Sequence, residues 1–353
     1  MSGPLLAPAG PRRQRWLRIT RGILGEFVLF VVLTALAPLL LLAACGVDFT
    51  LWLRRRKPWM AVRLLVLMWM CLFGELRGLV GVLRVWLLSG GPWSSDSPRR
   101  RQRTYRLQVA WASGHLAAVC RLCGVSFEVE GAELVGRGPL IIFARHASIV
   151  DNGLPARLIS GAHGFDLRYV LKHELQMLPT LDLGARWVPT CFVERASNDP
   201  EREIARVASL AIGLDGERDG VLIFPEGTRY TAAKLAALKA RSDIADPRLR
   251  ASIERLQHTL PPRTGGPLAL LAQAPQAAVL VCGHVGLDDF RDLREIWSGA
   301  LIGTTVRVRF RRYERAELPQ LREDLRTWLY ECWQELDDWV AAQHAARAAG
   351  VAA

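Results

Sequence analysis

The feature that most constrains this chain is a run of apolar residues near its N-terminus. Residues 27–49 hold one charged side chain, Asp48, which lies close to the end of the run. About 20 consecutive apolar residues are enough for a helix to cross the hydrocarbon core of a bilayer. The run is too long for a cleaved signal peptide and is not closed by a small-residue cleavage site. We therefore expect a permanent membrane anchor, which Pro38 should kink.

A second apolar segment, residues 59–88, is interrupted by charges. Its arginines are spaced by multiples of seven, so on a helix they form one stripe; they are Arg63, Arg77 and Arg84. The pattern predicts a helix that lies in the membrane interface, or one that packs on the first helix through Gly74 and Gly78. A full second crossing remains open. The two apolar helices are expected at about 23–49 and 59–89.

Charge supports a lipid partner. The chain has a formal net charge of +12, and its arginines cluster beside the apolar segments. These clusters lie at residues 12–21, 54–57 and 99–106. Basic residues that flank membrane segments are suited to anionic lipid headgroups. No recognition helix or aromatic-basic motif accompanies them, so membrane lipids, and not nucleic acid, are the expected partners.

A Gly-, Pro- and Ser-rich stretch, residues 90–98, marks the domain boundary. It separates a membrane-anchoring segment, 1–98, from a globular domain, 99–353, that ends in an amphipathic helix at about 318–346. Apolar runs that read as strands alternate with helical patterns in this domain; the expected strands are 126–130, 139–144, 168–171, 187–193, 221–224, 278–282 and 305–311. Alternation of this kind predicts an α/β fold with a mixed, mostly buried sheet flanked by helices.

The first motif with chemical content follows the strand expected at 139–144. His146 and Asp151 are five positions apart, which is about 140° on a continuous helix. They can meet only if His146 lies in a turn and Asp151 in the helix after it. A carboxylate beside an imidazole fixes its tautomer and raises its basicity, so the other nitrogen can accept a hydroxyl proton.

The second motif follows another predicted strand and reads Phe-Pro-Glu-Gly-Thr-Arg at residues 224–229. Gly227 allows the backbone to approach a ligand closely. Thr228 can donate a hydrogen bond, and Arg229 offers a planar fork that suits phosphate. The loop therefore offers groups that can bind an anion.

Together these motifs resemble the lysophospholipid acyltransferase family, which includes the 1-acylglycerol-3-phosphate acyltransferases. The family's first motif is Asn-His-x-x-x-x-Asp, often with Ser two places after the His, as Ser148 is here, and its third motif is intact at 224–229. Its second, a Gly and an apolar run ending in Arg, is similar to residues 184–195. The resemblance covers about residues 140–281 and the upstream anchor.

The resemblance implies direct acyl transfer without an acyl-enzyme. His146 would deprotonate the free hydroxyl of 1-acylglycerol-3-phosphate, which attacks the thioester of acyl-CoA or acyl carrier protein, giving phosphatidic acid. Asp151 would orient His146. The acceptor's glycerol and phosphate would be held by Arg195, Glu226, Gly227, Thr228 and Arg229. The active site would lie at the cytoplasmic surface of the cell membrane, where it meets both substrates.

No metal or cofactor is implied. Cys120 and Cys123 have metal spacing, but no second pair or histidine follows at finger spacing. Two departures leave the acceptor open. Arg145 replaces the family's Asn, where it could alter hydrogen bonding around the base or add a phosphate contact, and the fourth motif is not recognisable at residues 278–284. Acylation of another lysophospholipid or of glycerol 3-phosphate, and transacylation between lipids, remain alternatives. More remote ones are a histidine phosphatase-like hydrolase, with His284 as its second histidine, and an inactive membrane scaffold.

Overall fold

The computed structural model describes residues 12–91, 97–194, 199–244, 246–288, 290 and 293–350. Within these residues, seven strands form one sheet in the order β1-β7-β6-β2-β5-β3-β4. Their bounds are β1 Ser126–Glu130, β2 Leu140–Ala144, β3 Asp166–Lys172, β4 Thr190–Val193, β5 Asp219–Ile223, β6 Ala278–Val285 and β7 Thr305–Tyr313. All neighbours pair in parallel except β6 and β7, so the sheet is mixed. The predicted fold class is confirmed.

The central strand β2 explains why the sheet is buried on both faces. Its five residues are all buried, and they alternate between two apolar layers. Leu140 and Ile142 face one layer, whereas Ile141 and Phe143 face the other, as the period of two in a strand requires. A run without polar residues is the sequence expected for a strand covered on both sides.

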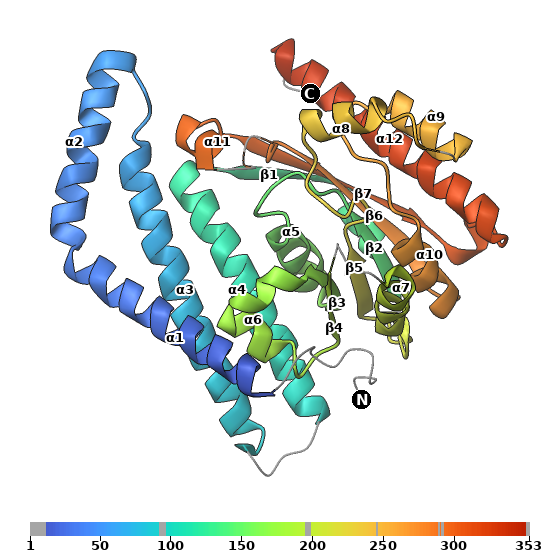
Figure 1. Cartoon of the computed structure of the whole chain (residues 1–353), viewed down its shortest axis with the longest axis horizontal. Coiled ribbons are helices and arrows are strands. Elements are labelled where there is room, and N and C mark those ends of the chain that lie inside the picture. Colours follow the sequence, from blue (N-terminus) through green and yellow to red (C-terminus); the bar gives the residue numbers. More distant parts are fainter. Residues whose placement is uncertain are drawn as a thin grey trace.

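Helices cover both faces of this sheet (Figure 1). On one side lie α4, Pro98–Cys123, and the short segments α5, Gly153–Pro155, and η4, Ala156–Gly161. On the other lie α7, Pro200–Ala208, α10, Gly265–Gln273, and α12, Arg322–Ala348. The remaining helical elements are α6 Pro179–Gly184, α8 Ala232–Lys239, α9 Pro247–Arg255, α11 Leu293–Ser298, η3 Ala132–Val135, η5 His173–Met177, η6 Ser209–Ala211 and η7 Arg315–Glu317.

Residues 12–91 of the N-terminal segment contain three long helices, α1 Arg12–Ala35, α2 Ala37–Arg55 and α3 Met60–Leu88. The prediction of one continuous helix over 23–49 is wrong, because the chain turns at Leu36. Pro38 lies in the first turn of α2. Proline has no N–H and its ring clashes with the carbonyl four residues earlier, so the kink expected at Pro38 becomes a break between two helices.

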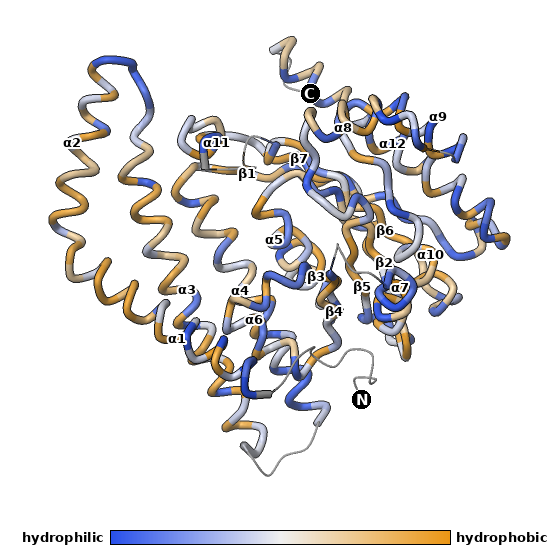
Figure 2. The backbone as a smooth tube through the Cα atoms, in the orientation of Figure 1, coloured by the Kyte–Doolittle hydropathy of each residue, from blue (hydrophilic) through white to orange (hydrophobic). Residues whose placement is uncertain are grey.

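Two of these helices, α2 and α3, are long and apolar enough to cross a membrane. Nineteen residues of α2 span about 28 Å, close to the thickness of the hydrocarbon core. Leu39 and Leu42 on α2 are 67% and 71% exposed. Apolar residues run along α1, α2 and α3 in Figure 2. An apolar surface of this extent needs cover from something other than water.

Helix α3 does not use its two glycines to pack on the first helix, which was one of the arrangements that its sequence left open. A Cβ on Gly74 would lie 2.9 Å from the His115 ring of α4, and one on Gly78 would lie 2.6 Å from Thr180 of α6. The arginine stripe faces the same way, since Arg63 donates to the carbonyl of Leu122 at the end of α4. The glycines therefore fix α3 against the α/β part of the chain.

Candidate active site

The predicted pair of His146 and Asp151 meets in the loop after β2. Nδ1 of His146 lies 3.1 Å from Oδ2 of Asp151. The aspartate lies in a turn two residues before α5, not inside a long helix. Since Asp151 binds Nδ1, the nitrogen of His146 that can accept a substrate proton is Nε2.

Asp151 also organises the backbone of this loop. Its Oδ2 accepts hydrogen bonds from the amides of Ala147, at 2.6 Å, and Ser148, at 2.7 Å. Burial alone would raise the pKa of Asp151, but His284 and His146 beside it hold the pKa below its usual range. The carboxylate is therefore ionised at neutral pH and can stabilise a positive charge on His146.

Glu226, expected to contact the substrate, lies beneath the active-site loops and is not among the residues that line the cavity. Its side chain is 3% exposed. Oε1 accepts from the amide of His146 and Oε2 from the amide of Leu260, both at 2.9 Å. Burial raises the pKa of Glu226 to about 7, against the effect of these hydrogen bonds and of Arg145. Glu226 thus ties the loop of the base to the loop that ends at Arg263.

The rest of the second motif does face a cavity. Gly227 has φ +68°, and a Cβ there would lie 2.9 Å from Nε of Arg263. A side chain would be strained and would also displace this arginine. Lys234 donates to the hydroxyl of Thr228 and to the carbonyl of Arg229, and so braces the loop from α8.

This cavity has a volume of about 840 Å³ and runs past His146. Basic side chains line it; they are Lys172, Arg229, Lys234 and Arg263. Apolar side chains also line it, among them Val170, Leu175 and Ile204. Arg195, predicted to bind substrate, lies outside the described residues, although its neighbour Glu194 lines the cavity. The volume and the mixed lining suit a ligand with an anionic head and an apolar part.

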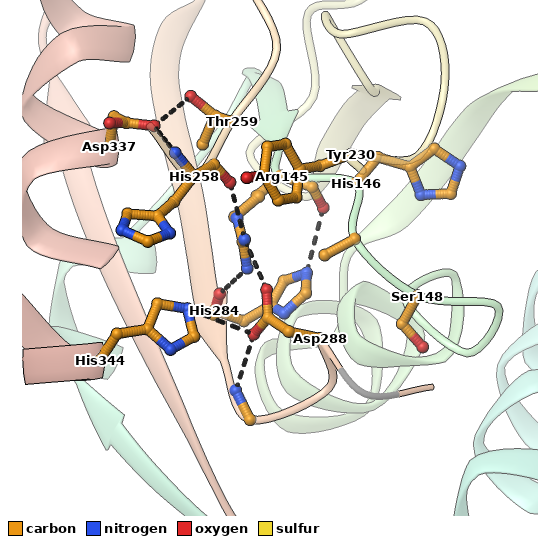
Figure 3. Close-up of polar contacts among 12 residues, drawn as sticks. Arg145, His146, Ser148, Tyr230, His258, Thr259, His284, Asp288, Asp337 and His344 are labelled. Carbon is orange, nitrogen blue, oxygen red and sulfur yellow. Dashed lines mark hydrogen bonds and ion pairs between the residues drawn. The ribbon is translucent and has the colours of Figure 1, made fainter. Parts of the chain in front are cut away.

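Arg145 points away from the cavity, so the phosphate contact considered for it is wrong. Its side chain is fully buried and donates to the carbonyls of His284 and His258 and to Oδ1 of Asp288. Figure 3 shows the guanidinium inside this cluster and the His146 ring directed away from it. The side chain that replaces the family's Asn therefore joins the ends of three segments: β2, β6 and the loop at residue 258.

Sequence reasoning missed or underrated several groups. Lys172 and Lys234 carried no signal in the sequence, whereas Arg263 follows a Leu-Pro-Pro sequence similar to part of the family, which could have pointed to it. His284, which the hydrolase alternative needs in the site, is 1% exposed on β6 and is not among the cavity-lining residues. The geometry of a two-histidine phosphatase is therefore not present among the described residues.

Comparisons with known proteins agree with the motifs. Residues 126–262 match the sequence model of the family described as Acyltransferase. Over 286 residues, the chain is 25% identical to 1-acyl-sn-glycerol-3-phosphate acyltransferase epsilon of Mus musculus, covering 73% of this chain and 74% of that protein. The crystal structure of the 1-acyl-sn-glycerophosphate acyltransferase PlsC from Thermotoga maritima matches 75% of this chain and 98% of its own, with 16% identity and a TM-score of 0.46.

The matched residues include both motifs that meet at the cavity, His146 with Asp151 and residues 224–229. Helices α2 and α3 indicate that the chain associates with a membrane. Residues 126–262 are an acyltransferase domain, and the chain is an O-acyltransferase similar to the 1-acylglycerol-3-phosphate acyltransferases.

Proposed function

We propose that the chain transfers a fatty acyl group from acyl-CoA or acyl carrier protein to the free hydroxyl of 1-acylglycerol-3-phosphate, giving phosphatidic acid. One observation carries the proposal. His146, held by Asp151, lines the same cavity as the cationic side chains of Arg229 and Arg263. A base for a hydroxyl and cations for a phosphate are the groups that this acceptor requires.

In the proposed reaction, Nε2 of His146 takes the proton of the acceptor hydroxyl as the oxygen attacks the thioester carbonyl. The C–S bond then breaks, and the thiolate leaves with the proton that His146 carries. Asp151 keeps the proton on Nδ1 and stabilises the imidazolium between these steps. The larger contribution of the cavity is to hold hydroxyl and thioester together, which makes the attack effectively unimolecular.

The acceptor phosphate is proposed to lie at Arg229, with Thr228 as a hydrogen-bond donor and Arg195 as a further contact. Arg229 can bind two phosphate oxygens at once through its fork. The apolar side chains of the cavity would contact an acyl chain. No resident metal or cofactor is needed, since both reactants of the transfer are substrates.

The proposal also implies where in the cell the protein acts. The acceptor and product belong to the bilayer, whereas the head of the acyl donor is soluble. Helices α2 and α3 would hold the catalytic part at the surface of the cell membrane. Because acyl-CoA and acyl carrier protein are cytosolic, the cavity should open on the cytoplasmic side.

The first test uses detergent-purified protein, labelled oleoyl-CoA and a panel of lysophospholipids. We expect ester on lysophosphatidic acid, and a rate for His146→Ala reduced by about 10²-fold or more, the usual contribution of a general base. His163→Ala is the matched control, because this partly exposed histidine lies outside the cavity. Equal rates for His146→Ala and the wild type would contradict the assignment of the base.

The panel also separates the alternatives. Ester on another lysophospholipid or on glycerol 3-phosphate would keep the mechanism and change the acceptor. Ester formed from a labelled phospholipid without any thioester would identify a transacylase. If the acceptor is labelled only when acyl carrier protein carries the labelled acyl group, acyl carrier protein is the donor.

A further inference from the structure

The two oxygens of the Asp151 carboxylate have very different surroundings. Oδ2 accepts from His146, Ala147 and Ser148 at 2.6 to 3.1 Å. Oδ1 is also buried, yet in the part of the chain that the structure describes it has no hydrogen bond of normal geometry. A buried carboxylate oxygen without a donor is costly, so the group that faces Oδ1 matters.

That group is the imidazole of His284. Its Nε2 lies 3.4 Å from Oδ1 of Asp151 and 3.1 Å from the carbonyl oxygen of Arg145. Both neighbours are acceptors, so Nε2 must carry a proton. Nδ1 is buried and has no hydrogen-bond partner among the described residues, so the polar contacts of the ring are those of Nε2. The N–H of His284 thus donates to the carbonyl of Arg145 and lies within ion-pair distance of Oδ1 of Asp151.

His284 is held more firmly than a loop residue could be. It lies in β6, paired with Val308 of β7, and it is 1% exposed. Its own carbonyl accepts from Nη1 of Arg145 at 2.7 Å, so the two residues bind each other reciprocally. Groups on packed strands are placed more precisely than groups on loops.

We propose that His284 is a positioning residue of the acyl-transfer site: its Nε2–H fixes Oδ1 of Asp151 and so holds Oδ2 on Nδ1 of His146. The inference rests on the proposed role of His146 as the base. Without this N–H, the carboxylate can rotate or take up a proton, and either change leaves the His146 tautomer unfixed. The rate of the chemical step should fall, while binding in the cavity should not change.

The test compares two amides at position 284. The amide nitrogen of glutamine reaches about as far as Nε2 of histidine, whereas that of asparagine reaches only as far as Nδ1. His284→Gln should therefore keep kcat within about threefold of the wild type. His284→Asn and His284→Leu should lower kcat by about 10- to 100-fold, as for other residues that orient a catalytic group from behind. KM values for both substrates should stay within about twofold.

His344→Leu is the control, because it removes a partly buried histidine that lies near Asp288 and not near Asp151. Melting temperatures of all variants in detergent separate folding from function. A second readout needs no acceptor: the rate at which diethyl pyrocarbonate modifies His146, followed by peptide mass spectrometry. It should slow by about 10-fold in His284→Asn and His284→Leu only.

The outcomes distinguish the two proposals. If all three variants at position 284 keep the wild-type kcat and modification rate while His146→Ala is inactive, the positioning role of His284 is wrong and the base stands. If kcat follows only the melting temperatures, with Gln and Asn alike, His284 is structural and the inference is also wrong. If His146→Ala remains active, the assignment of the base fails, and the positioning role of His284 in acyl transfer fails with it.

Discussion

The cavity has two halves that are built differently. Around the base, the charged groups are almost inaccessible: Arg145 is 0%, Asp151 1% and Glu226 3% exposed. Around the second motif, Lys234 and Arg263 are exposed and Arg229 is partly so. The first half fixes its groups with buried hydrogen bonds before any substrate arrives, whereas the second presents cations that can still adjust.

This difference separates chemistry from recognition. Groups that are fixed in advance lower the barrier because they need no reorganisation during the reaction. Accessible cations exchange water for phosphate and contribute to binding in the ground state and in the transition state alike. Substitutions in the buried half should therefore lower kcat, and substitutions in the exposed half should raise KM.

The largest effect is expected for Asp151→Asn. If its amide nitrogen takes the place of Oδ2, it faces the amides of Ala147 and Ser148 and leaves Nδ1 of His146 without an acceptor. If it takes the place of Oδ1, it faces the Nε2–H of His284. Both arrangements also remove the negative charge beside His146. Either arrangement disturbs the tautomer of the base, so kcat should fall by about 10²- to 10⁴-fold. The measurement is the initial rate at saturating donor against acceptor concentration, with Asp243→Asn on the surface as control. An increase in KM with kcat intact would assign Asp151 to binding.

Arg145→Asn, which restores the family's usual residue, should test the buried half through stability. It leaves Asp288, whose side chain is 15% exposed, without its guanidinium, and breaking a buried pair costs about 3–5 kcal/mol, an upper bound for this one. Denaturation in detergent should show this loss, and Asp288→Asn added to Arg145→Asn should recover part of it. A variant as stable as the wild type would mean that the pair contributes nothing.

The pH dependence of the Arg145–Asp288 pair has a definite sign. Burial opposes ionisation, but Arg145 holds the pKa of Asp288 at about 2, below its usual value of 3.8. The stability that this shift supplies is present above about pH 4 and is lost as the pH falls towards 2. In Arg145→Asn the free energy of unfolding should change less over this interval.

The base and the second motif could be predicted because each is a short contiguous segment that follows a buried strand. The contacts that hold these motifs in place could not be predicted, because the residues that make them are far apart in sequence. Glu226 meets the amide of Leu260, and Arg145 meets Asp288, 143 positions away. These contacts depend on β2 lying between β5 and β6, an order that hydrophobic patterns do not reveal.

In the N-terminal segment, a contiguous pattern was easy to recognise, but the arrangement of its helices was not predictable. Hydropathy located the apolar residues correctly and pointed to Pro38, but it could not distinguish a kinked helix from two helices. The outcome depends on how the chain packs after the turn at Leu36. Likewise, Gly74 and Gly78 signal a close approach by some partner, and the pattern does not say that the partner is the α/β part.

The smallest effect is expected in the exposed half. Arg229→Ala should raise the KM for lysophosphatidic acid by about 10- to 100-fold, which corresponds to the loss of a charged hydrogen bond. The donor KM and kcat should stay within about threefold. Arg229→Lys keeps the charge but loses the planar fork. Its KM for lysophosphatidic acid should lie between those of the wild type and Arg229→Ala. Arg255→Ala, an exposed cation of α9 outside the cavity, controls for net charge. A fall in kcat with KM unchanged would place Arg229 in the half of the base, and the comparison of the two halves would then be wrong.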